Sequence, residues 1–82
     1  MEYKAYVLKS ESYDRNYYGS CQNVEERLKE HNLGKVKSTK PFRPWKVIYY
    51  ETFNSRSEAY QRELFFKSSE GKIFLKNQGV IK

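Results

Sequence analysis

Residues 16–34, NYYGSCQNVEERLKEHNLG, decide the fold because they place an aromatic strand pattern directly before a short helix pattern. Paired tyrosines followed by glycine are consistent with a strand over residues 15–20. Asn23 can cap a helix, and Glu26, three residues later, completes a capping box. The glycine that closes the stretch is a common helix end. We therefore predict a strand followed by a helix from Val24 to Asn32.

The rest of the chain predicts two more strands and two more helices. Residues 3–9, YKAYVLK, would form a hairpin with the strand at 15–20, and residues 45–52, WKVIYYET, would form a third strand. The near-continuous apolar run of this third strand predicts that it is the most buried one. A second capping box precedes a helix expected over residues 56–68, and a short third helix is expected before Gly79.

These elements predict an α+β fold in one domain, residues 1–82. We expect a small three-stranded sheet, mostly antiparallel, flanked by helices. A helix between the second and third strands also permits a mixed sheet. The chain is too short to form two separate cores.

The composition suits a partner that is a polyanion. The chain has 16 Lys and Arg residues against 10 Asp and Glu, a formal charge of +6, and 17% aromatic residues. Basic side chains bind phosphates, and aromatic side chains stack on bases. The same charge can also serve only to keep the surface hydrated. The single cysteine, Cys21, excludes an internal disulfide and is best read as a small filler. With no long apolar stretch, we expect a cytoplasmic protein with no membrane partner.

Two polar residues share the apolar face of the first predicted helix. On a wheel of 100° per residue, Arg27 and His31 lie on the same side as Val24 and Leu28. An unpaired charge near a core is very costly, so the arginine must have a partner.

The second predicted helix has a similar feature, because Glu63 shares a stripe with Ala59 and Phe66. One interpretation is structural: Arg27 and Glu63 form a salt bridge between two helices packed on the same sheet. The other is functional, with the two helices and the hairpin tyrosines directing a cation and a carboxylate into one phosphate-binding cleft. The pattern alone leaves both open.

Several segments together resemble a known family. KAYVL near the N-terminus, YYG at the end of the second strand, an arginine eight positions after that glycine, and SRSEAYQRE are similar to the motifs of the GIY-YIG nuclease domain. HNLGK and RPWKVIYYE are similar to its small single-domain bacterial branch, so the resemblance covers essentially the whole chain. The chain departs from the motif names at Lys4-Ala5, which replaces Gly-Ile, and at Tyr18, which replaces isoleucine.

The resemblance implies an endonuclease that uses Mg²⁺ or Mn²⁺ to hydrolyse DNA phosphodiester bonds, with repair or recombination as the process it serves. Tyr6 and Tyr17 match the tyrosines of the two motifs, and Tyr17 would accept the proton of the attacking water or orient that water. Tyr6 and His31 would be its hydrogen-bond partners. Gly19 matches the glycine that ends the second motif, where a side chain would crowd the approaching backbone.

Three further site residues follow from the same resemblance. Arg27 matches the arginine that contacts the scissile phosphate, and Glu63 matches the metal ligand. Asn77 is a candidate for an asparagine that helps to hold the site in many members.

A basic loop is expected between the first helix and the third strand. It carries two prolines and little apolar periodicity, and four of its cations would follow a nucleic-acid backbone. These cations are Lys35, Lys37, Lys40 and Arg43.

Two other functions remain open from sequence. A non-catalytic nucleic-acid-binding module on the same fold would use the basic face without cutting. A domain for protein partners would keep Arg27 and Glu63 as a structural ion pair. The oligomeric state is open between a monomer and a weak homodimer.

Overall fold

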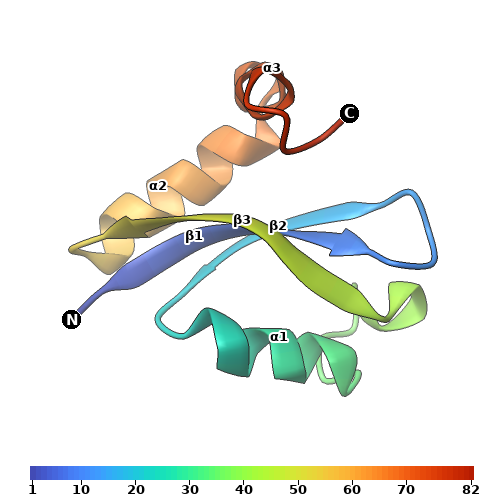
Figure 1. The fold of residues 1–82 in the computed structure, drawn as a ribbon. Helices are drawn as coiled ribbons and strands as arrows, with labels where there is room; N and C mark the ends of the chain where they lie inside the picture. The colour runs from blue at the N-terminus through green and yellow to red at the C-terminus, as the bar shows by residue number, and fades with distance from the viewer.

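The computed structural model describes all 82 residues and shows one sheet with helices on both faces (Figure 1). The elements follow the chain as β1 (Tyr3–Ser10), β2 (Asn16–Cys21), α1 (Val24–Asn32), the 3₁₀ turn η1 (Lys40–Phe42), β3 (Trp45–Phe53), α2 (Arg56–Lys67) and α3 (Ser69–Asn77). The predicted α+β fold and its three helices are confirmed.

The sheet has the strand order β2-β1-β3, and both pairings are antiparallel. A mixed sheet, which the sequence also permitted, is therefore not formed. Tyr6 pairs with Gly19 on β2 and with Tyr50 on β3, so it lies in the middle of the sheet. The outer side of β2 is a free edge.

The most buried strand is β1, not β3 as predicted from its apolar run. Residues 5–8 of β1 are fully buried, whereas Lys46 and Tyr50 of β3 are exposed. The physical reason is position: β1 is paired on both sides and covered on both faces, and β3 is an edge strand with one open side. Local hydrophobicity does not specify strand order.

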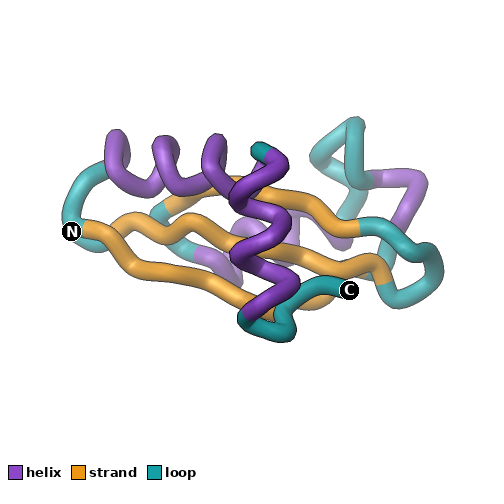
Figure 2. The backbone as a smooth tube through the Cα atoms, turned by 90° about the horizontal axis from the view of Figure 1, so that it is seen from above, coloured by secondary structure: helices purple, strands orange, loops and turns teal.

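The two faces of the sheet have separate cores. On one face, Tyr6, Leu8 and Trp45 pack beneath α1 with the partly buried Val24 and Leu28. The alternate residues of β1 face the other way, where α2 and α3 cover them (Figure 1). Figure 2 shows α3 crossing the strands, while α2 lies chiefly over β2 and β1. The helices α1 and α2 are therefore on opposite faces.

The helix ends follow the predicted capping signals. The Asn23 side chain accepts a hydrogen bond from the Glu26 backbone N–H at 3.1 Å, and α1 covers the predicted residues. Ser55 caps α2 in the same way, and this helix ends at Lys67, one residue before the predicted end. None of the helices has both the length and the apolarity needed to cross a membrane.

Candidate active site

The centre of the candidate site is a buried hydrogen-bonded chain that joins β1 to α1 and to the loop after it. The Tyr6 hydroxyl lies 3.1 Å from His31 Nε2, and His31 Nδ1 lies 2.8 Å from Thr39 Oγ1. All three residues are almost completely buried. Burial is the main cause that raises the pKa of Tyr6 and lowers the pKa of His31 to about 4, so both groups are neutral at pH 7.

Gly19 makes room for this chain. A Cβ atom built on Gly19 would lie 2.5 Å from the Tyr6 phenol oxygen and 2.6 Å from its Cζ. The predicted crowding is therefore real, but it involves the Tyr6 side chain and not a backbone segment. The glycine is required because a buried aromatic ring occupies the space above it.

Tyr17 lies against the same chain through ring contacts. Its ring centroid is 4.8 Å from that of His31, in an edge-on arrangement, and 6.3 Å from that of Tyr6. Tyr6 and His31 bond to each other, and no hydrogen bond joins either of them to Tyr17, so their role as its hydrogen-bond partners stays a prediction. Tyr17 is only partly buried, and its hydroxyl makes no hydrogen bond to another protein group.

Arg27 lies beside the buried hydrogen-bonded chain and forms an ion pair within its own helix. Its guanidinium donates to the Glu30 carboxylate at 2.8 Å, and its side chain is 37% exposed. Glu30 raises the pKa of Arg27 most, and the Tyr6 hydroxyl raises it further. Burial is the main cause that lowers the pKa of His31, and Arg27 is the second. Arg27 also opposes the rise in the pKa of Tyr6. The group is a permanent cation that reaches both the buried chain and solvent.

Glu63 stands on α2 and is held by two contacts. Ser20 of β2 donates its hydroxyl hydrogen bond to Oε1 at 2.7 Å, and the Lys67 ammonium lies 2.7 Å from Oε2. The side chain is 14% exposed. The alternative of an Arg27–Glu63 ion pair is therefore wrong, because the two residues have other partners and their helices pack on opposite faces of the sheet.

The two halves of the site meet at the free edge of β2. Tyr17 and Ser20 point to opposite faces of this strand, toward α1 and α2 respectively. The pKa of Lys67 is raised first by Glu63 and, more weakly, by Tyr17. Tyr17 also raises the pKa of Tyr6, after burial. Tyr17 contacts the half on the α1 side and Ser20 contacts the half on the α2 side, so β2 joins the two halves.

The Glu63 half has the donor chemistry that a Mg²⁺ or Mn²⁺ ion requires. Its donors are a carboxylate and a hydroxyl oxygen, both hard ligands, and a cation, the Lys67 ammonium, is already held at Oε2. The molecule has no cluster of three His, Cys, Asp or Glu side chains. These residues therefore suit a divalent ion that is held by one carboxylate, with water as most of its other ligands.

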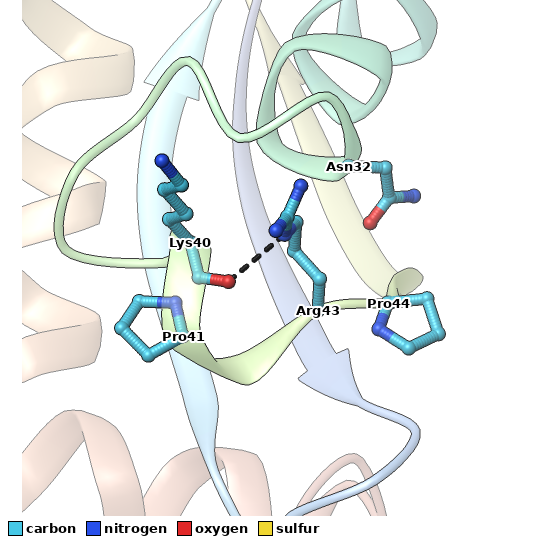
Figure 3. Close-up of a pocket in the computed structure, with 5 residues that line it drawn as sticks. All are labelled: Asn32, Lys40, Pro41, Arg43 and Pro44. Atoms are coloured by element: carbon cyan, nitrogen blue, oxygen red, sulfur yellow. Dashed lines mark hydrogen bonds between the residues drawn. The ribbon is translucent and has the colours of Figure 1, made fainter.

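The four predicted nucleic-acid-binding cations are exposed on the loop between α1 and β3. Two of them, Lys40 and Arg43, line a surface pocket with Asn32, Pro41 and Pro44 (Figure 3). Arg43 Nε donates to the Lys40 carbonyl at 2.9 Å, which fixes the guanidinium relative to the loop. The pocket therefore presents two cations from one ordered turn.

Two other residues noted from sequence lie away from the chemistry. Asn77 is exposed at the end of α3, and no side-chain hydrogen bond joins it to the residues above. Cys21 is half-buried, and burial raises the pKa of its thiol, which agrees with a filler and not with a nucleophile.

Sequence reasoning missed three residues that hold the site together. They are Ser20, Lys67 and Thr39. Lys67 has a visible signal, since it follows Glu63 by four residues on a predicted helix. Ser20 and Thr39 have none, because their partners are distant in sequence or lie in a loop without periodicity.

Comparisons with known proteins identify the family of the chain. Residues 2–77 match the family described as the GIY-YIG catalytic domain. A UPF0213 protein of Listeria welshimeri is 47% identical over 68 residues, which cover 80% of this chain and 73% of that protein. A UPF0213 protein of Staphylococcus haemolyticus is 43% identical over 67 residues, covering 79% of this chain and 82% of that one.

A solved structure shares the fold. The solution NMR structure of a UPF0213 protein from Bacillus halodurans superposes with a TM-score of 0.55 and 28% sequence identity, over 95% of this chain and 85% of that one. The family match, the bacterial relatives and the shared fold lead to one conclusion: the chain belongs to the GIY-YIG catalytic domain family, among the small UPF0213 proteins of bacteria.

Proposed function

We propose that this protein is a metal-dependent endonuclease that hydrolyses DNA phosphodiester bonds. The observation that carries the proposal is the meeting of two unlike groups at the edge of β2. A buried phenol–imidazole chain with an adjacent arginine lies on one side, and a cation-binding carboxylate lies on the other. Hydrolysis of a phosphodiester needs charge neutralisation at phosphorus and a group that directs water, and these residue types provide both.

Each residue has a role that follows from its surroundings. Arg27 binds the scissile phosphate, because its guanidinium is permanently charged and partly exposed beside the buried chain. Tyr17, which packs on His31 and lies on the strand that joins the two halves, orients the attacking water or accepts its proton. His31 and Tyr6 stay neutral, and their rings form the surface on which Tyr17 packs. Glu63 provides the anionic site on α2.

A divalent ion would be held by Glu63, near the Ser20 hydroxyl. When bound, Mg²⁺ or Mn²⁺ supplies positive charge to the phosphate and acidity to a coordinated water. Lys67 would leave Oε2 to make room, and its flexible stem lets it do so without moving α2.

The substrate class is supported by the charge of the molecule. The net charge is +6, and the four exposed loop cations lie on one connection between α1 and β3. Such a surface binds the phosphate backbone and carries little base-specific information. We propose that DNA shape directs cleavage, in repair or recombination within the cytoplasm.

The direct test is a cleavage panel with plasmid, flapped and branched DNA in Mg²⁺ or Mn²⁺. Glu63→Gln keeps the size of the side chain and removes its charge, so cleavage is expected to fall by about 100-fold or more. Glu70→Gln is the matched control, because Glu70 is an exposed carboxylate in the first turn of α3. Equal cleavage by all three proteins would overturn the metal assignment.

The same panel separates cutting from binding. A protein that binds DNA in a salt-sensitive manner, and does so equally after Glu63→Gln or chelation, but never cuts it, would be a non-catalytic binding module. That result would overturn the proposed activity while leaving the basic loop in place.

A further inference from the structure

Thr39 is the last member of the buried hydrogen-bonded chain. Its hydroxyl oxygen lies 2.8 Å from His31 Nδ1 and 3.2 Å from the Val36 carbonyl, to which it donates. The residue is 1% exposed, so water does not replace these contacts. A hydroxyl that donates to a carbonyl is available to accept, and the nearby imidazole nitrogen is the donor.

The other end of the chain requires the same arrangement. The acceptor within reach of the Tyr6 hydroxyl is His31 Nε2, and the phenol is 1% exposed. Arg27 also bonds this hydroxyl, but a guanidinium can only donate. If Nε2 carried the proton, it would donate to the phenol oxygen and the buried phenol proton would have no acceptor. Buried donors without acceptors are strongly disfavoured. The acceptor at Thr39 and the donor at Tyr6 together place the proton of the neutral imidazole on Nδ1 and leave Nε2 to accept.

The backbone around Thr39 holds it rigidly in this position. Its carbonyl accepts from the Trp45 indole N–H at 2.9 Å, and Asn32 bonds the backbone N–H and carbonyl of Trp45 at 2.7 and 3.1 Å. The next residue is Lys40, one of the loop cations. The loop that carries the basic pocket is thus tied to the imidazole through one side chain.

We infer that Thr39 is a positioning residue, which sets the Nδ1–H tautomer of His31 so that Tyr6 is held as a donor beside Arg27 and Tyr17. The catalytic part of this inference rests on the proposed nuclease activity. Thr39 itself does not touch the substrate. It acts by determining which of the two imidazole nitrogens accepts a hydrogen bond and which one donates.

The test compares Thr39→Val with Thr39→Ser. Valine keeps the shape and removes the acceptor, whereas serine keeps the hydroxyl. The first readout is the tautomer, read from the ¹⁵N shifts of the His31 ring at pH 7 without DNA or metal. We expect Nδ1–H in the wild type and in Thr39→Ser, and a shift toward Nε2–H in Thr39→Val.

The second readout is the rate of DNA cleavage with saturating Mn²⁺. Thr39→Val is expected to lower kcat by about 10- to 100-fold with little change in KM, and Thr39→Ser to restore it. An unchanged tautomer, or an unchanged kcat in Thr39→Val, would overturn the positioning role. A wild-type protein that cuts no DNA would overturn the proposed function, whereas the tautomer measurement decides the Thr39 assignment independently.

Discussion

Gly19 and Tyr6 lie opposite each other on β2 and β1, and the Tyr6 phenol fills the space that a side chain at position 19 would need. The Tyr6 ring cannot move aside easily, because it is buried and its hydroxyl is bonded to His31. Position 19 in the second motif must therefore be glycine, because the Tyr6 side chain of the first motif fills the space beside it. The two motifs are one structural unit.

Gly19→Ala should destabilise the protein by about 1–3 kcal/mol, because it overpacks a core without free space. It should also disturb the bond between Tyr6 and His31. Urea unfolding gives the stability, and the His31 ring signals in NMR report the bond.

Gly79→Ala is the control for Gly19→Ala. Gly79 has a φ of +75° and open space around its Cα, so alanine strains the backbone there without touching the site. Both variants should lose stability, but only Gly19→Ala should change the His31 signals. A change of those signals in both would show that the contact with Tyr6 is not the cause.

The stability of the protein should fall as the pH is lowered from about 6.5 to 4. The pKa of His31 is lowered to about 4 in the folded state, against about 6.5 in the unfolded chain, chiefly by burial. The unfolded state thus binds the proton first, so the stabilisation is complete above pH 6.5 and is lost toward pH 4. The full loss is about 3 kcal/mol.

Urea unfolding at a series of pH values measures this dependence. His31→Asn provides the comparison, because it removes the titrating group. Between pH 6.5 and 5, where carboxylates contribute little, the variant should show a much flatter dependence. Equal slopes in the two proteins would mean that His31 is not protected from protonation by its burial.

Lys67→Met should increase the affinity for Mn²⁺ by about two- to fivefold. Lys67 neutralises Glu63 at 2.7 Å, and partly exposed ion pairs of this kind contribute up to about 1 kcal/mol. Without the ammonium, the carboxylate is available to the ion. Titration of free Mn²⁺ by electron paramagnetic resonance measures the affinity at fixed ionic strength.

Lys72→Met is the matched control for Lys67→Met, since Lys72 is an exposed lysine on α3. It makes the same change in net charge at a lysine that has no ion pair with Glu63. A similar increase in both variants would assign the effect to net charge and not to the ion pair. Glu63→Ala should abolish the binding.

Lys40→Gln should weaken DNA binding and make it less sensitive to salt. Each phosphate contact contributes about 0.9 to the slope of log K against log salt concentration, so losing one should lower that slope by about one. Fluorescence anisotropy with a labelled duplex over a range of salt concentrations gives the value. Lys76→Gln, which changes an exposed lysine at the end of α3, should leave the slope unchanged.

The local parts of the fold could be predicted from the sequence because their signals are local. The capping residues gave the start of α1 and α2, and helical spacing placed His31 and Glu63 on inward faces. Strand order and the choice of face could not be predicted, because they depend on contacts between distant segments. This is why β3 was predicted as the most buried strand, and why Arg27 and Glu63 could be imagined as partners.

The candidate site shows the same division. Motif residues on regular elements, such as Tyr6, Arg27 and Glu63, could be identified from spacing and resemblance. Thr39 could not, because it is an ordinary threonine in a loop rich in lysine, and only the folded structure brings it to within 2.8 Å of His31.

The free edge of β2 runs between the two halves of the site, because Tyr17 and Ser20 of this strand point to opposite faces of the sheet. An extended peptide that added a fourth strand to this edge would cover Tyr17 and the approach to Glu63 at once, using main-chain hydrogen bonds. For the DNA cleavage proposed above, such a peptide would compete with the substrate without carrying a phosphate group. Strand addition at β2 would then inhibit a highly basic protein with an uncharged compound.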